Sequence, residues 1–173
     1  DANTSLTWFD RDGMVRGTLG ERASYTDIEL SPDASRVAVS IQDEQTGNID
    51  IWLMGTGAEG ARTRFTFDRA ADRSPVWSPD GTQIAFSSER VTPRATFIKS
   101  ANGIGNETVL ATVAGESVEP GAWASDGKTL LLYSDRGLFK LIVGSGQQPT
   151  GFSLWQPQAS RPKISGDGRW LAY

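Results

Sequence analysis

The sequence predicts an all-β fold made of repeated four-stranded antiparallel sheets. Three observations indicate it: a turn motif that recurs along the chain, short apolar segments after each turn, and the absence of any stretch with helical periodicity. The clearest copy of the motif is residues 76–81 (Val-Trp-Ser-Pro-Asp-Gly). Pro79 presets φ for the first turn position, Asp80 tolerates the second, and Gly81 supplies a positive φ that closes the hairpin.

The turn motif recurs at a spacing typical of β-propeller blades. Three further copies occur at residues 30–34, 123–127 and 164–168. The turn aspartates are Asp33, Asp80, Asp126 and Asp167. They lie about 40 to 50 residues apart, which matches the length of one four-stranded blade. The sequence therefore predicts a β-propeller with four repeat units, in which these aspartates hydrogen-bond the backbone of their own turns.

Each complete unit is expected to contribute four strands. The expected strands are residues 27–30, 36–40, 50–54 and 62–66 in the first complete unit, 75–77, 83–87, 95–99 and 107–110 in the second, and 122–123, 129–133, 138–142 and 151–154 in the third. The second strand of every unit is apolar on both faces, which favours blades that stack face to face. Four aromatic residues at equivalent third-strand positions are expected to pack between blades: Trp8, Trp52, Phe97 and Phe139.

The two ends of the chain resemble complementary halves of a blade. Residues 6–10 and 15–19 have the pattern of a third and an outer strand, and the sequence reaches Tyr173 after a second strand. One interpretation is that residues 1–173 form a single propeller domain, closed by a hybrid blade from both termini, which would remove exposed sheet edges. The other interpretation is a segment of a larger propeller. The sequence alone does not decide between them.

The composition excludes several classes of function. The chain has 173 residues, a formal net charge of −4, and neither His nor Cys. Without these residues it can form neither a His/Cys zinc site nor a Ser-His-Asp or Cys-His catalytic centre. No apolar run approaches the ~18 residues of a membrane-spanning helix. We therefore predict a domain without catalysis, cofactor or metal, which neither inserts into a membrane nor binds nucleic acid.

The motifs resemble a known repeat family. Ser-Pro-Asp-Gly followed by Ile-Ala-Phe (residues 78–86), Asp-Ile-Trp-Leu (50–53) and Arg-Phe-Thr-Phe (64–67) are similar to the TolB-like, Trp-Asp-type propeller repeat, and the resemblance covers the whole chain. Residues 6–13 and 65–81 resemble a narrower group, the C-terminal propellers of bacterial membrane-linked serine/threonine protein kinases. Those propellers usually have six blades. The resemblance implies a sensor or interaction domain of a larger bacterial protein, placed outside the cytoplasmic membrane, and the kinase motifs themselves are absent.

The residues that lead into each innermost strand are expected to gather at one mouth of the propeller channel. Alignment of the units on Trp77 selects six of them: Tyr25, Asp27, Asp72, Arg73, Glu119 and Arg161. Their mixed charge predicts a polar mouth that binds a protein partner, a peptide end or a small polar ligand. The alternative is a solvated rim of weak ion pairs.

Two enzymatic settings are alternatives to a binding module. A calcium-dependent propeller hydrolase would require Tyr25, Asp27, Asp72 and Glu119 to converge on an axial ion. A propeller that gates a peptidase would require a nucleophile elbow elsewhere in the protein, and this chain contains none. The sequence does not identify the ligand, the partner or the oligomeric state.

Overall fold

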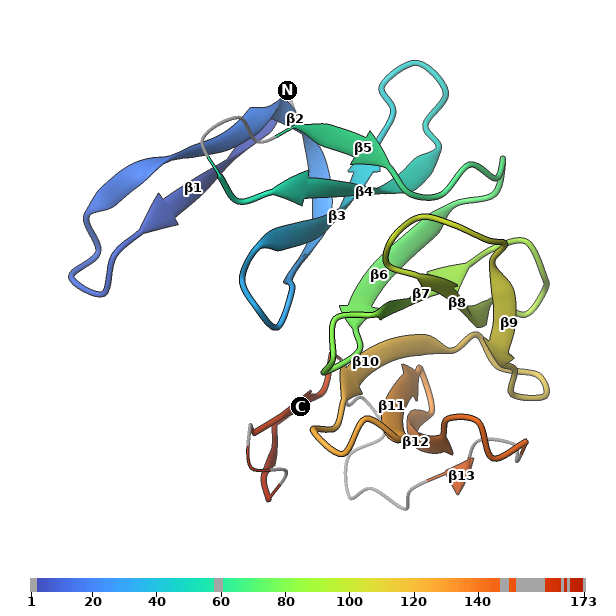
Figure 1. Cartoon of the computed structure of the whole chain (residues 1–173). Helices are drawn as coiled ribbons and strands as arrows, with labels where there is room; N and C mark the ends of the chain where they lie inside the picture. The colour runs from blue at the N-terminus through green and yellow to red at the C-terminus, as the bar shows by residue number, and fades with distance from the viewer. Residues whose placement is uncertain are drawn as a thin grey trace.

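The computed structural model describes residues 3–57, 61–146, 150–151, 161–165, 167 and 169–172. These residues form fifteen β-strands and no helix, so the predicted all-β fold is confirmed (Figure 1). Within the same residues, no helix of the length and apolarity needed to cross a bilayer is found. Every pair of hydrogen-bonded strands is antiparallel.

The strands form three sheets and a terminal pair, each in sequence order. The first sheet contains β1 (Thr4–Phe9), β2 (Val15–Leu30), β3 (Arg36–Gln42), β4 (Ile49–Gly55) and β5 (Arg62–Arg64); the second contains β6 (Asp72–Trp77), β7 (Gln83–Ser88), β8 (Ala95–Ser100) and β9 (Thr108–Ala111); the third contains β10 (Glu119–Trp123), β11 (Thr129–Ser134), β12 (Gly137–Ile142) and β13 (Thr150–Gly151); and β14 (Lys163–Ile164) pairs with β15 (Leu171–Ala172). This meander order is the one expected of propeller blades.

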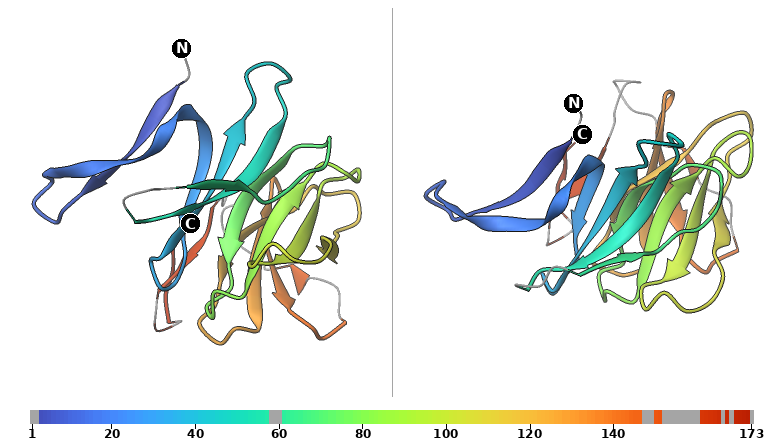
Figure 2. Two further views of the ribbon diagram at one scale, coloured as in Figure 1. Left: turned by 45° about the horizontal axis from the view of Figure 1, so that its top comes forward. Right: turned by 90° about the horizontal axis from the view of Figure 1, so that it is seen from above.

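The sheets stand side by side like blades, with β2, β6 and β10 on a common side (Figure 2). The second half of β2 contacts β6, β6 contacts β10, and β10 contacts β14. These four strands are the innermost strands of successive units. Because they follow one another around a common side of the molecule, residues at the same position in each unit are brought together there.

The expected hybrid blade is absent among the described strands. β1 pairs with the first half of β2, β14 pairs with β15, and no backbone pairing joins the two hairpins. The reason lies in β2, which runs unbroken from Val15 to Leu30 instead of forming two separate strands. Its second half pairs with β3, so the β1–β2 hairpin belongs to the first sheet and projects away from the other sheets (Figure 1).

The second strands of the three complete units are buried on both faces, as predicted. In β7, Ile84 and Phe86 pack into the core shared with the first sheet, whereas Ala85 packs into the core shared with the third sheet. In β3, Ala38 faces the second sheet. Apolar residues on both faces of one strand therefore stabilise two sheet–sheet interfaces at once. Leu171 and Ala172 of β15 are exposed, because no described sheet covers this last pair.

Three of the four predicted inter-blade aromatic residues pack against buried clusters. Phe97 is buried in the core between the first and second sheets, and Phe139 is partly buried against the core between the second and third sheets. Trp52 is partly buried against a cluster formed by the first sheet alone, so it does not pack between sheets as predicted. Trp8 does not fit the prediction and is 36% exposed. It lies on the projecting β1–β2 hairpin, where no second described sheet stacks against it.

The turn aspartates have the structural role that the sequence predicts. Asp80 Oδ1 accepts hydrogen bonds from Ser78 Oγ (2.6 Å) and from the backbone N–H of Thr82 (3.0 Å). In the first copy, Asp33 makes the equivalent bonds, which stabilise its ionised form and lower its pKa to about 2. Ala34 occupies the glycine position of this turn with φ of 56°, so the turn geometry is kept at a residue that rarely adopts it.

Candidate functional site

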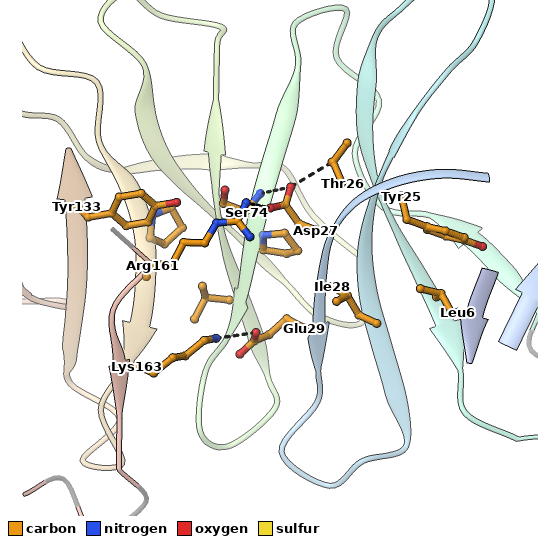
Figure 3. Close-up of a pocket in the computed structure, with 14 residues that line it drawn as sticks. Leu6, Tyr25, Thr26, Asp27, Ile28, Glu29, Ser74, Tyr133, Arg161 and Lys163 are labelled. Atoms are coloured by element: carbon orange, nitrogen blue, oxygen red, sulfur yellow. Dashed lines mark hydrogen bonds and ion pairs between the residues drawn. The ribbon is translucent and has the colours of Figure 1, made fainter. Parts of the chain in front are cut away.

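The innermost strands line an open cavity of about 230 Å³ on the common side of the sheets (Figure 3). Its wall includes one residue from the same position in every unit, three residues before the end of the innermost segment. These residues are Asp27 before Leu30, Ser74 before Trp77, Pro120 before Trp123, and Arg161 before Ile164. The cavity therefore lies where the repeats converge, which is the position of a propeller channel.

Backbone irregularities shape this cavity. The pairing of each inner strand with the next strand shifts register beside it, between Tyr25 and Asp27 in β2, between Arg73 and Val76 in β6, and across Gly121 in β10. Such bulges redirect side chains away from the regular alternation of a strand. Bulges often occur next to binding sites, and here they occur in all three complete units.

Two polar residues of the wall also have left-handed backbone conformations. Ser74 has φ of 54° and Arg161 has φ of 49°, and each precedes a proline. This region costs roughly 1–3 kcal/mol for a non-glycine residue. Strain of this kind persists only where surrounding contacts impose it, and it is concentrated at functional sites. The two strained residues occupy equivalent positions of their units.

Polar contacts connect the walls of the cavity. Asp27 receives a hydrogen bond from the backbone N–H of Ser74 (3.4 Å) and forms an ion pair with Arg161 (3.3 Å). Ser74 Oγ donates to Glu119 Oε2 (2.7 Å), and the hydroxyl of Tyr133 donates to the same oxygen (2.9 Å). Glu119 also forms an ion pair with Arg94.

Tyrosine hydroxyls at the cavity remain protonated. Burial, together with the nearby Glu119 carboxylate, raises the pKa of Tyr133 to about 12. Burial likewise raises the pKa of Tyr25, whose hydroxyl donates to the backbone carbonyl of Glu21 (2.6 Å). Both groups therefore act as hydrogen-bond donors at neutral pH, and neither is suited to act as a base.

The six residues selected from the sequence divide into two groups. Tyr25, Asp27 and Arg161 line the cavity, and Glu119 lies beside it through its bonds to Ser74 and Tyr133. Asp72 and Arg73 lie outside it. The bulge in β6 directs Ser74 into the cavity, while Arg73 pairs with Glu89 (3.2 Å).

Sequence reasoning missed Ser74, Tyr133 and Lys163. Ser74 and Pro120 could have been selected by counting back the same number of residues in every unit, three before the end of the innermost segment. Tyr133 lies at the far end of β11 and has no equivalent signal, since its position depends on how the third sheet packs.

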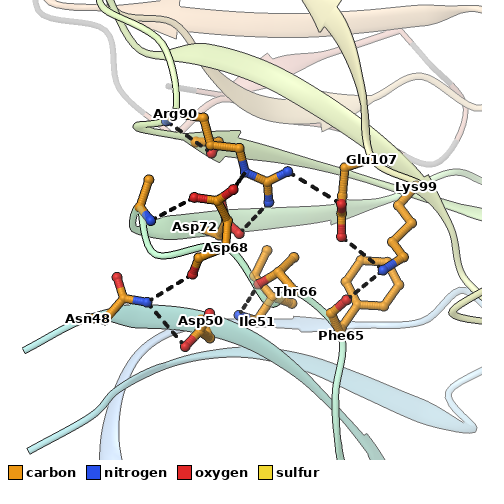
Figure 4. A network of polar contacts seen from close by, with 12 residues as sticks. Asn48, Asp50, Ile51, Phe65, Thr66, Asp68, Asp72, Arg90, Lys99 and Glu107 are labelled. Carbon is orange, nitrogen blue, oxygen red and sulfur yellow. Dashed lines mark hydrogen bonds and ion pairs between the residues drawn. The ribbon is translucent and has the colours of Figure 1, made fainter. Parts of the chain in front are cut away.

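Asp72 belongs to a buried ionic network between the first and second sheets (Figure 4). Arg90 lies 2.7 Å from Asp72 and 3.4 Å from Glu107. Lys99 donates to Glu107 (2.9 Å) and to the backbone carbonyl of Phe65 (2.9 Å). The network joins β6, β8 and the loops that follow β7 and precede β9 to the segment after β5, so its role is structural.

The convergence required for an axial calcium ion is not found. Asp72 pairs with Arg90 in the inter-sheet network, and Tyr25 donates to a backbone carbonyl. In the described part of the chain, no group of three or more acidic, His or Cys residues is arranged to hold a metal ion. The geometry thus gives no support to the hydrolase that the sequence left open.

Comparison with known proteins identifies the family of the chain. A family model described as the TolB beta propeller domain matches residues 25–173. The chain belongs to this TolB propeller family. The matched range begins in the second half of β2, so it includes all the cavity-lining residues except Leu6 and leaves out β1 and the first half of β2. The resemblance to kinase-linked propellers remains a prediction.

Solved TolB structures share the fold. The crystal structure of TolB from Acinetobacter baumannii is similar with a TM-score of 0.80 and 23% identity, over 97% of this chain and 42% of that one. A putative TolB from Agrobacterium tumefaciens has a TM-score of 0.70 and 19% identity, over 95% of this chain and 66% of that one. At these identities the similarity concerns the TolB fold alone.

One curated relative is described as a peptidase and not as a TolB protein. An uncharacterized peptidase, YuxL, from Bacillus subtilis (strain 168) is 30% identical over 114 residues. The match covers 63% of this TolB-type chain and 17% of the peptidase. The chain therefore spans a small part of the length of that relative.

Proposed function

We propose that this TolB-type domain is a non-catalytic binding module whose axial cavity receives a peptide end or a small polar ligand. One observation carries the proposal: equivalent positions of four units converge on one cavity, and three of them are the polar residues Asp27, Ser74 and Arg161. Neutral donors and groups of both charges are therefore available within one concave site. Few and well-placed polar groups in a concave site are typical of ligand recognition.

The size and charge of the cavity limit the ligand. Its volume of about 230 Å³ is below the roughly 300–1,000 Å³ of sites for drug-sized molecules, so it suits a terminal residue or a single side chain. A carboxylate would be bound by Arg161, and an ammonium group by Asp27. The formal net charge of −4 supports a protein or peptide partner over nucleic acid.

The wider architecture is part of the same proposal. We propose four repeat units, which form either one domain over residues 1–173 or a segment of a larger propeller. The kinase-type resemblance favours a sensor domain outside the cytoplasmic membrane. Family membership supports the propeller architecture.

The binding proposal is testable with a mixture of tripeptides of random sequence. In ¹H–¹⁵N spectra of the labelled protein, we expect the tripeptides to shift the amide signals of Ser74, Gly121 and Tyr133. The Asp27→Asn variant is expected to lose these shifts, because it removes the charge that orients a ligand ammonium group. Asp12→Asn, which changes an exposed aspartate of the hairpin turn, is the matched control. Absence of shifts at millimolar tripeptide would refute the proposal.

A second candidate function is that of a propeller attached to a peptidase module. The 30% identity to the uncharacterized peptidase favours it. In such a protein the axial cavity would select which peptide ends reach the catalytic module. Hydrolysis of fluorogenic dipeptides by the natural full-length protein tests this role, and a full-length protein without such activity would exclude it.

A further inference from the structure

Two ion pairs with the same spacing join the first and last inner strands. Asp27 and Glu29 lie two residues apart on β2, and Arg161 and Lys163 lie two residues apart in the segment that leads into β14, so the two pairs can meet residue by residue. Arg161 pairs with Asp27 at 3.3 Å, and Lys163 pairs with Glu29 at 2.9 Å (Figure 3). The two segments therefore match in register and run in the same direction.

These charges are not part of the repeat motif. The equivalent positions are Ser74 and Val76 in β6, and Pro120 and Ala122 in β10. The two middle units thus carry no charge at either position. The acidic pair is complementary in charge to the basic pair, and the repeat motif does not require this complementarity.

The acidic and basic partners differ in how firmly the fold holds them. Side chains of Asp27 and Glu29 are 14% and 29% exposed, whereas those of Arg161 and Lys163 are 70% and 59% exposed. The second half of β2 is hydrogen-bonded to β3. β14 pairs only with the two-residue β15 within the described residues. The acidic pair is therefore part of the β2–β3 wall, whereas the basic segment is held by its two ion pairs, by β15 and by the packing of Pro162 on Gly121.

We infer that Asp27 and Glu29 form a docking site for a peptide segment with basic residues two positions apart, and that the segment 161–164, which contains β14, is the chain's own occupant of this site. The inference rests on the proposed function, since it names the ligand class of the same cavity. An external peptide of this class must displace β14. The segment 161–164 (Arg-Pro-Lys-Ile) is itself the pattern that the site accepts.

Competition between the resident segment and an added peptide provides the test. The probe is a dye-labelled Arg-Pro-Lys-Ile peptide with blocked ends, and its affinity is measured by fluorescence anisotropy. In the double variant Arg161→Gln/Lys163→Gln the acidic site is vacated. Because a tethered competitor acts at roughly millimolar effective concentration, we expect the variant to bind the peptide about tenfold more tightly than the wild-type chain. The gain is expected to disappear at high salt, which screens these partly exposed charges.

A matched control removes two positive charges elsewhere. Arg11→Gln/Lys140→Gln changes one exposed residue in the hairpin turn and one on β12, and it should bind the peptide as weakly as the wild-type chain. Adding Asp27→Asn and Glu29→Gln to the vacated variant should abolish binding. Melting curves of all variants verify that they are folded.

The outcomes separate this inference from the proposed function. Equal peptide affinity for the wild-type chain and the vacated variant overturns the inference, as does binding that survives loss of both carboxylates. If random tripeptides still shift the cavity amides in that case, the proposed function stands without it. If neither the tripeptides nor the basic peptide bind, both fail.

Discussion

Replacing Arg90 with methionine is expected to destabilise the domain by about 3–5 kcal/mol, because it leaves a buried charge without its partner. Asp72 is fully buried, and Arg90 lies 2.7 Å from its carboxylate. The guanidinium carbon of Arg90 also lies 5.0 Å from the centroid of the Phe97 ring, so the variant loses this cation–π contact together with the ion pair. Urea-induced unfolding followed by tryptophan fluorescence measures the free energy of unfolding.

The destabilisation caused by Arg90→Met is expected to depend on pH, because it arises from the unpaired charge of Asp72. Burial raises the pKa of Asp72 above the ordinary value of 3.8. A carboxyl whose pKa is higher in the folded state stabilises the fold below its unfolded pKa and loses that contribution as the pH rises through the folded pKa. In Arg90→Met the pKa should rise further, so the destabilisation should be smaller at pH 4 than at pH 7. Arg136→Met, which removes an exposed partner of Glu116, should cost ~0–1 kcal/mol at both pH values. Equal losses in the two variants would contradict the prediction.

Truncating Phe86 to alanine is expected to cost about 3–5 kcal/mol through the cavity it leaves. Phe86 is fully buried on β7. Its ring lies edge-on to Phe65 of the first sheet at 6.4 Å between centroids and stacks with Phe97 of β8 at 6.1 Å. The side chain therefore contributes to packing within the second sheet and to the interface with the first.

An aromatic residue two positions after Phe65 is the matched control. Phe67 is exposed and contacts mainly the cations Arg64 and Lys99, so Phe67→Ala should cost about 0.5–1 kcal/mol. The same urea titrations apply to both variants, and near-ultraviolet circular dichroism should show loss of aromatic packing only for Phe86→Ala. Similar destabilisation by both substitutions would mean that the Phe65–Phe86–Phe97 cluster is not the core of this interface.

Strand positions were predictable because turn chemistry and alternation are local. The strands expected at 83–87 and 95–99 occur as β7 (Gln83–Ser88) and β8 (Ala95–Ser100). The strand expected at 62–66 ends at Arg64, since Phe65 turns into the core and Thr66 Oγ accepts a hydrogen bond from Ile51 N–H. Such an ending depends on the neighbouring sheet, which the sequence does not display.

The site was harder to predict because register is not visible in spacing. Asp72 and Arg73 precede Trp77 by the same distance that places Tyr25 and Thr26 before Leu30. The bulge in β6 nevertheless directs Ser74 toward the cavity, and burial with Arg90 removes Asp72 from it. The charges in the sequence indicated which residues could bind a ligand, whereas the backbone geometry determines which of them reach the cavity.

The contact between Gly121 and Pro162 has a consequence for how this corner of the molecule can vary. A Cβ at position 121 would lie 2.3 Å from Cγ of Pro162, so any larger residue there would collide with the proline ring. The proline in turn lies between Arg161 and Lys163. Mutational drift at this corner is therefore restricted to paired changes: a side chain at position 121 is compatible with the fold only when the ring opposite it is also replaced.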